Sequence, residues 1–151
     1  MALIHKLLER DEGFRKSCYL DHLGYQTIGI GRLIDARKGG GLSKHEALFL
    51  LNNDINERES ALTAYLPWYS TLNEVRRAVI LSMSFQMGVP GLLLFRNTLK
   101  AVGEGRYNDA ADGMMQSLWS RQTPLRASRL AQAMRDGGVE ALELDEDPPQ
   151  P

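Results

Sequence analysis

The hydrophobic pattern of this chain changes its period at Gly13. Before Gly13, apolar residues recur at the spacing of one helix face, and they are Leu3, Ile4, Leu7 and Leu8. Glycine commonly ends a helix because it adopts a left-handed backbone without a Cβ clash. The segment 14–34 is instead rich in Tyr, Thr and Ile, with Asp-His-Leu-Gly at residues 21–24 as a turn signal. We therefore expect a short helix that runs directly into two or three short strands.

The remainder of the chain favours helices. Ala36–Gly41 (ARKGGG) is expected to be a flexible connection. Ser43 and Glu46 have the spacing of a capping box, which predicts a long helix from there to about Leu66, before Pro67. Further helices are expected over residues 73–87, 90–95, 98–102, 107–115, 116–121 and 124–135, the last with Thr123 as N-cap and Pro124 at its first position.

These patterns predict an α+β fold that is mostly helical, with one small sheet near the amino terminus. We expect one domain over residues 1–139, since 151 residues can bury a proper core. Its parts would be a small lobe (about 12–42), a linking helix (about 43–66) and a helical lobe (about 67–137) on which the amino-terminal helix (2–12) packs. The acidic, proline-containing segment 140–151 is expected to be disordered.

Composition narrows the classes of function. Cys18 is the single cysteine, which excludes an intrachain disulfide and a cysteine-based zinc site and fits a reducing compartment. His5, His22 and His45 have no paired metal-ligand spacing, so we expect no metal site. No Gly-x-Ser-x-Gly motif is present, and the Gly-Ile-Gly at 29–31 does not continue into a nucleotide-binding GxGxxG pattern.

Neither the amino-terminal segment nor the most apolar internal segment predicts export or a membrane anchor. Charges are too closely spaced in the first fourteen residues for the apolar core of a signal peptide. The apolar segment 78–95 contains Gln86 and a Gly88/Pro90 break, which favours a buried core helix over a membrane span. We therefore expect no stable association with a membrane.

Charge is distributed unevenly along the chain. The net charge is −1, but residues 140–151 hold five acids and no base, so the rest carries about +4. A mildly basic body suits a polyanionic partner such as a cell-wall polymer or a nucleic acid. Four arginines near the carboxyl end permit a nucleic-acid recognition helix or, equally, a solvated helix face, and they are Arg121, Arg126, Arg129 and Arg135.

Glu12 and Asp21 are a candidate pair of catalytic carboxyl groups. Cleavage of a glycosidic bond needs one carboxylic acid to protonate the leaving oxygen and a second carboxylate to direct water or attack the sugar. A helix-end Glu and a turn Asp on the adjacent hairpin could face each other, and Thr27 could hold a water through its hydroxyl. Gly29 and Gly31 alternate along the expected strand, which is typical of a close approach by backbone or ligand. Spacing alone favours the simpler interpretation that both carboxylates are solvated surface groups.

The same residues resemble a known family. Asp11-Glu-Gly-Phe-Arg15, followed by Tyr19-Leu-Asp-His-Leu-Gly-Tyr-Gln-Thr-Ile-Gly-Ile-Gly-Arg32, is similar to the catalytic motif of the T-even type of tailed-phage lysozymes, glycoside hydrolase family twenty-four. The resemblance continues, in the same order, in segments 75–78, 84–88, 95–99 and 119–127, and covers about residues 2–135.

This resemblance implies roles for individual residues. Glu12 would be the general acid, while Asp21 and Thr27 would position the attacking water on the opposite face of the sugar, with inversion at the anomeric carbon. Arg126 would pair with Glu12. Residues at positions that line the saccharide cleft of the family, or that support it, are Gly31, Leu33, Phe85, Gln86, Thr98, Gly113 and Trp119. We interpret the stretch 11–33 as one wall of that cleft and the helical lobe as the other.

Three departures from the family pattern stand out. Arg32 replaces the usual histidine, and we predict an ion pair between Arg32 and Asp54, the acid at the matching helix position. The connection from Leu33 to Ser43 is short, so we expect a reduced sheet and cleft lip. Gly113 stands where the family offers a polar contact, which puts that contact with the saccharide in question.

The resemblance implies a monomeric phage endolysin that needs no cofactor and hydrolyses the β-1,4 bond between N-acetylmuramic acid and N-acetylglucosamine in peptidoglycan. Such an enzyme would collect in the host cytoplasm until it is released to the cell wall, and it would bind no nucleic acid. The alternatives are a lytic transglycosylase acting on the same bond, a helical nucleic-acid-binding protein using the Arg126 helix, and an inactive wall-binding lysozyme fold. Retention of Glu12, Asp21 and Thr27 argues against the last.

Overall fold

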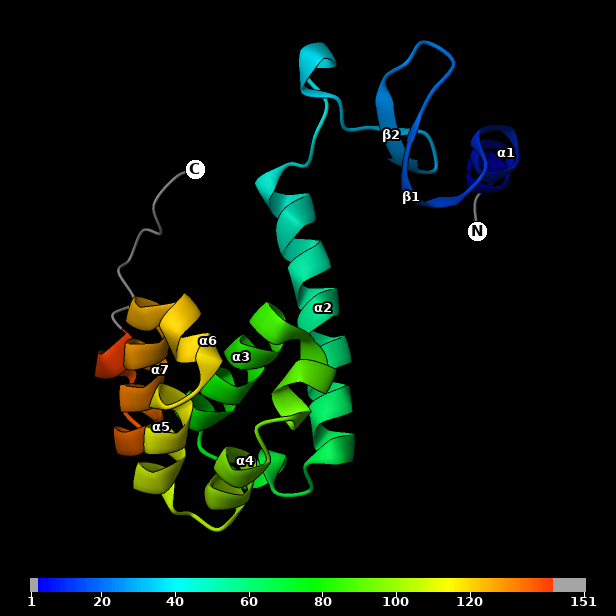
Figure 1. Cartoon of the computed structure of the whole chain (residues 1–151). Helices are drawn as coiled ribbons and strands as arrows, with labels where there is room; N and C mark the ends of the chain where they lie inside the picture. Colours follow the sequence, from blue (N-terminus) through cyan, green and yellow to red (C-terminus); the bar gives the residue numbers. More distant parts are fainter. Residues whose placement is uncertain (1–2, 143–151) are drawn as a thin grey trace. The chain divides into compact units, whose positions relative to one another are not determined.

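The computed structural model describes residues 3–142, and the chain divides after Asn52 into two compact units. The long helix α2 (Lys44–Tyr65) begins in the first unit and continues into the second (Figure 1). As predicted from the sequence, the fold is mostly helical, with one small antiparallel sheet near the amino terminus. That the two units form one catalytic domain stays a prediction.

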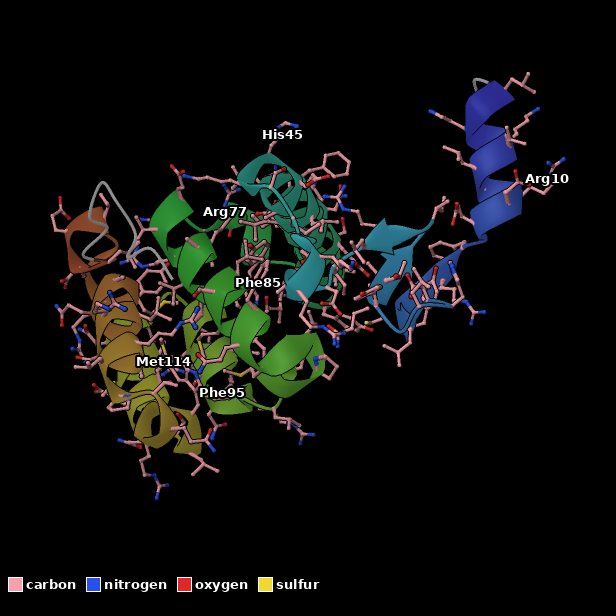
Figure 2. All side chains as sticks on the ribbon, turned by 90° about the horizontal axis from the view of Figure 1, so that it is seen from above. Arg10, His45, Arg77, Phe85, Phe95 and Met114 are labelled. Atoms are coloured by element: carbon pink, nitrogen blue, oxygen red, sulfur yellow. The ribbon has the colours of Figure 1, made fainter. Side chains whose placement is uncertain are left out.

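The first unit opens with helix α1 (Leu3–Glu12), which ends at Gly13 as predicted. Gly13 has a φ of +69°, and its amide donates a hydrogen bond to the carbonyl of Glu9 at 3.0 Å. This left-handed cap stops the helix with Glu12 as its last residue. In Figure 2, Arg10 projects from the side of the same helix.

The sheet consists of β1 (Arg15–Leu20), β2 (Gln26–Gly29) and β3 (Arg32–Leu33), in that order. Thr27 on the central strand lies opposite Tyr19 on one side and Leu33 on the other. Residues directly opposite one another in a sheet point to the same face. The register thus aligns Tyr19, Thr27 and Leu33 in one row across the sheet.

The connection after β3 is ordered, so the prediction of a flexible ARKGGG segment was wrong. Ala36–Lys38 form a short 3-10 helix, η1, whose N-cap Asp35 accepts a hydrogen bond from the amide of Arg37 at 2.9 Å. A Cβ atom at Gly40 would lie 2.8 Å from the carbonyl oxygen of Leu33 and 2.8 Å from the amide nitrogen of Asp35. The glycines therefore permit a tight turn against β3.

Helix α2 begins with the predicted capping box. The hydroxyl of Ser43 accepts a hydrogen bond from the amide of Glu46 at 3.3 Å, and the carboxylate of Glu46 accepts one from the amide of Ser43 at 2.8 Å. Each group satisfies an amide that a helix start leaves without a partner. His45, which follows in the first turn, is exposed and points away from the helix (Figure 2).

The second unit is a helical bundle. After the end of α2 come a 3-10 turn and five helices, which are η2 (Tyr69–Thr71), α3 (Glu74–Leu93), α4 (Arg96–Gly103), α5 (Tyr107–Met115), α6 (Leu118–Gln122) and α7 (Pro124–Asp136). Helices α5 and α7 lie side by side (Figure 1). Met114 is fully buried among the helices of this unit (Figure 2). The core that these helices share includes Leu62, Val79, Ile80, Met83, Leu92, Val102 and Met134.

Helix α3 carries the most apolar segment of the chain. Gly88 interrupts it with non-helical angles (φ +75°, ψ 159°), which confirms the break predicted at Gly88/Pro90. Among the described residues, no single helix is long and apolar enough to span a membrane, whereas α3 and α4 pass that test only as a pair bent by 103°. The apolar residues Val79, Ile80 and Met83 of α3 are buried in the core, as expected of a core helix.

Two details at the carboxyl end differ from the prediction. Thr123 is the N-cap residue of α7 and Pro124 follows it, as predicted, but the Thr123 hydroxyl donates a hydrogen bond to the carbonyl of Trp119 at 3.1 Å and makes no capping bond to the helix. Val139–Leu142 form a further 3-10 turn, η3, and Ala141 and Leu142 pack against the core, so the expected disordered tail cannot begin at residue 140. The rest of that predicted tail, residues 143–151, lies outside the described part of the chain.

Candidate active site

A pocket of about 430 Å³ in the first unit contains all three predicted catalytic residues. It extends from the end of α1, over the sheet, to the end of η1. The predicted residues that line it are Glu12, Asp21, Thr27, Gly31 and Leu33. Further lining residues, which the sequence did not single out, are Tyr19, His22, Leu23, Tyr25 and Lys38.

Glu12 lies against the backbone of the hairpin at Gly31. A Cβ atom at Gly31 would stand 2.7 Å from Oε2 of Glu12 and 3.0 Å from its Cδ, inside van der Waals contact. Gly31 also has a φ of +68°, a backbone conformation that L side chains rarely adopt. Glycine at this position therefore makes room for the Glu12 carboxyl group, which is the close approach that the alternating glycines predicted.

Asp21 is oriented by the turn in which it lies. Its Oδ1 accepts hydrogen bonds from the amides of Leu23 at 2.9 Å and Tyr25 at 2.8 Å. The amide of Tyr25 is the chief cause that lowers the pKa of Asp21, since a hydrogen bond to the carboxylate favours the ionised form. Within the described residues, Oδ2 of Asp21 takes part in no hydrogen bond, so this oxygen is available to a ligand in the pocket.

Thr27 is the buried residue of the three, with 4% of its surface exposed. Its hydroxyl donates a hydrogen bond to the carbonyl of Tyr25 at 3.2 Å. A hydroxyl oxygen also has two acceptor lone pairs, so Thr27 can still accept a hydrogen bond from a water molecule in the pocket. The sheet register fixes its position between Tyr19 and Leu33.

Arg32 binds a different acid from the one predicted. Its guanidinium forms a salt bridge with Glu46, with 2.8 Å between Nη1 and Oε1, and it donates to the carbonyl of Gly41 at 2.9 Å. Asp54, the predicted partner, belongs to the second unit, and its pairing with Arg32 stays a prediction. Glu46 lies at the start of α2, where the Ser43 capping box already holds its carboxylate, whereas Asp54 lies two turns farther along the helix.

Within the second unit, two of the predicted supporting residues bind each other. The indole Nε1 of Trp119 donates a hydrogen bond to Oε1 of Gln86 at 2.8 Å. Trp119 is 6% exposed and meets Phe95 edge to face, with ring centroids 6.4 Å apart. Phe85 lies under the guanidinium of Arg58, whose Cζ is 4.1 Å from the ring centroid.

Thr98 and Gly113 are neighbours in the second unit, and both line the same polar pocket of about 460 Å³. A Cβ atom at Gly113 would lie 2.6 Å from the Oγ1 of Thr98. The Thr98 hydroxyl therefore occupies the space that a side chain at position 113 would need.

Arg126 lies on α7 and donates a hydrogen bond to the hydroxyl of Ser82 at 3.2 Å. Its pairing with Glu12 stays a prediction. Arg121 and Arg129 are exposed like Arg126, whereas Arg135 forms a salt bridge with Asp112 at 2.6 Å. Within residues 3–142, no group of three His, Cys, Asp or Glu side chains could hold a metal ion.

Comparison with known proteins shows the family to which this chain belongs. The family model described as phage lysozyme matches residues 9–133, which is most of the chain. The chain belongs to the phage lysozyme family. It is a T4-type muramidase, a glycosidase that hydrolyses peptidoglycan. The resemblance seen in the sequence is thereby confirmed, as are the fold class and the enzyme class.

Relatives of this lysozyme chain come from different organisms and differ in length. It is 29% identical to "Probable T4-type lysozyme 1" of Dictyostelium discoideum, in an alignment that covers 93% of this chain and 98% of that protein. It is also 29% identical to the "Pre-baseplate central spike protein Gp5" of Enterobacteria phage T4, covering 93% of this chain but 29% of that protein. The family is thus found as single lysozymes and within a larger protein.

Proposed function

We propose that this lysozyme is a phage endolysin that cleaves the β-1,4 bond between N-acetylmuramic acid and N-acetylglucosamine, with Glu12 as general acid. One observation carries the proposal. The pocket of the first unit is lined by a carboxyl group held against Gly31, a second carboxylate with an uncommitted oxygen, and the hydroxyl of Thr27. Two carboxyl groups and a water-binding group are what hydrolysis of a glycoside requires.

In the proposed reaction, Glu12 transfers its proton to the glycosidic oxygen as the bond from that oxygen to the anomeric carbon breaks. A water molecule held by Thr27 and Oδ2 of Asp21 attacks the anomeric carbon and transfers a proton to the Asp21 carboxylate. Exchange with solvent then restores both carboxyl groups. Attack opposite the leaving oxygen inverts the anomeric configuration.

The surroundings of Asp21 suit the role of base. A carboxylate that accepts two backbone amides stays ionised at neutral pH, because those bonds lower its pKa. Glu12 must instead be protonated to act as an acid, because it supplies the proton that the leaving oxygen accepts. Gly31 and Leu33 are proposed to contact the saccharide in the same pocket, and Phe85, Thr98 and Gly113 are proposed as further contacts.

Replacement of Glu12 by Gln tests the proposal. Glu12→Gln should lose clearing of permeabilised bacteria, whereas Glu9→Gln, an exposed change on the same helix outside the pocket, should keep it. Mass spectrometry of the products should find reducing-end muramic acid. An anhydro-sugar, lighter by one water, would indicate a transglycosylase, and equal clearing by Glu12→Gln would reject the mechanism.

The endolysin role needs a separate test in cells. The protein expressed inside bacteria should leave them intact until a membrane-permeabilising agent is added, and lysis should then follow within the time course of the purified enzyme. Lysis without permeabilisation would contradict a role that depends on a membrane hole. Lysates of cells that express wild type or Glu12→Gln can also be added to permeabilised bacteria. Equally slow clearing of those bacteria by the two lysates would contradict the activity itself.

A further inference from the structure

Lys38 places an ammonium group at the edge of the catalytic pocket. It lines the same pocket as Glu12, Asp21 and Thr27, and its side chain is exposed. No salt bridge among residues 3–142 involves Lys38. The other basic side chain that lines the pocket is His22, on the turn beside Asp21.

The neighbouring cation, Arg37, is already neutralised. Its Nη2 donates to Oδ2 of Asp35 at 2.7 Å, and its Nε donates to Oδ1 at 3.0 Å. The Arg37 side chain is the chief cause that holds the pKa of Asp35 well below its usual range. The η1 turn therefore presents two adjacent basic side chains, of which Arg37 is paired with Asp35 and Lys38 takes part in no salt bridge within residues 3–142.

Lys38 is also held in position by its surroundings. Its amide donates to the carbonyl of Asp35 at 3.1 Å, and Gly39, with a φ of +69°, caps the turn immediately after it. Its ammonium lies 4.8 Å from the centroid of the Tyr25 ring, near enough for a cation–π contact. Tyr25 lines the same pocket as Lys38 and Asp21, so this contact keeps the ammonium beside a residue of the pocket.

We propose that Lys38 binds a carboxylate of the peptide that peptidoglycan carries on its muramic acid residues. This proposal rests on the proposed function and names the part of the substrate that the pocket recognises beyond the sugar ring. The glycan backbone is uncharged, so a free cation at the pocket edge has no partner on the sugars themselves. The stem peptides supply carboxylates next to the bond that is cleaved.

The experiment compares two forms of one substrate. Sonicated peptidoglycan is used either untreated or with its carboxylates converted to amides, and KM and kcat are measured for wild type, Lys38→Met and Lys38→Arg. On the untreated substrate, Lys38→Met should raise KM by about two- to fivefold, as expected for a partly exposed ion pair, with kcat nearly unchanged. Lys38→Arg should restore KM, and amidation should abolish the difference between wild type and Lys38→Met.

A matched control is Lys16→Met, an exposed lysine of β1 outside the pocket, which should behave as wild type on both substrates. An equal rise in KM on both substrates would show a structural role and overturn the proposal, as would no rise at all. Failure of the proposed function would look different, because wild type and Glu12→Gln would then be equally inactive on both substrates.

Discussion

Arg32 and Glu46 form a two-point ion pair, with 2.8 Å from Nη1 to Oε1 and 2.8 Å from Nη2 to Oε2. Arg32 follows the Gly-Ile-Gly segment of the pocket, and Glu46 is the acidic member of the capping box that starts α2. The pair therefore connects the strand that carries Leu33 to the beginning of the long helix. A planar guanidinium suits this bidentate geometry, and it stays charged throughout the pH range in which proteins are folded.

The pair leads to a prediction about stability and pH. The pKa of Glu46 is lowered from 4.5 to about 2, chiefly by the amide of Ser43 and then by the side chain of Arg32. A lowered pKa in the folded state stabilises the protein above the ordinary pKa, and this stabilisation is lost as the pH falls through the folded value. Glu46→Gln should therefore unfold at a lower temperature than wild type near neutral pH.

The difference between Glu46→Gln and wild type should shrink below pH 4.5 and vanish near pH 2. Thermal unfolding followed by circular dichroism across this range measures it. Glu57→Gln, an exposed change on α2 at a residue with no ion pair in the described part of the chain, is the control. A gap between Glu46→Gln and wild type that stays constant down to pH 2 would contradict the assignment.

Gly31 and Gly29 offer a matched pair of substitutions. Both have a φ of +68°, but a Cβ at Gly29 meets no atom within 4 Å, whereas a Cβ at Gly31 meets Glu12 at 2.7 Å. Each change to Ala should cost about 1–2 kcal/mol of stability through backbone strain. Gly31→Ala alone should also displace Glu12 and reduce peptidoglycan cleavage at least about tenfold. Urea unfolding and a clearing assay measure the two effects, and equal activity of the two variants would refute the contact.

The substitution Asp21→Asn distinguishes the structural role of Asp21 in its turn from its proposed role as the catalytic base. The amide oxygen of Asn can still accept the hydrogen bonds of Leu23 and Tyr25, so the thermal midpoint should change little. Loss of the base should lower kcat by about a hundredfold or more. Asp21→Ala should lose both the activity and the turn. An Asp21→Asn enzyme that keeps its activity and releases anhydro-sugars would show that the second carboxylate is dispensable.

Thr98 and Gly113 should be coupled in a double-mutant cycle. Gly113→Ala places a methyl group 2.6 Å from the Thr98 hydroxyl, and such overpacking costs about 1–3 kcal/mol. In a Thr98→Ala background the same change should cost much less, because the oxygen that it meets is gone. Chemical unfolding of the four proteins measures the coupling energy, and additive effects would argue against steric matching of the two positions.

Much of the first unit could be predicted because its signals are local. The end of α1 at Gly13 follows from the backbone preferences of glycine. The turn at Asp21 and the capping box of Ser43 and Glu46 arise from side chains that bond amides two to four residues away. The carboxyl groups of Glu12 and Asp21 were identified by residue type and spacing, together with a family resemblance that extends over distant segments.

Other features depend on residues that are distant in the sequence. Arg32 binds Glu46 because the start of α2 meets the strand that carries Arg32, and the family resemblance that suggested Asp54 carries no such information about this chain. The order in the ARKGGG segment comes from the packing of Gly40 against Leu33 and from the bonds of Asp35 to its neighbours. A glycine-rich sequence by itself indicates only that the backbone can adopt many conformations.

The sequence by itself indicated which groups are candidates for catalysis, and it determined where α1 ends and where α2 begins, because those helix ends are set within a few residues of chain. Only the tertiary structure decided what surrounds each group: Gly31 behind the Glu12 carboxyl, Tyr19 and Leu33 on either side of Thr27, and Lys38 at the pocket edge. Strand register and close packing set these neighbours, and both depend on contacts between segments rather than on the spacing within one.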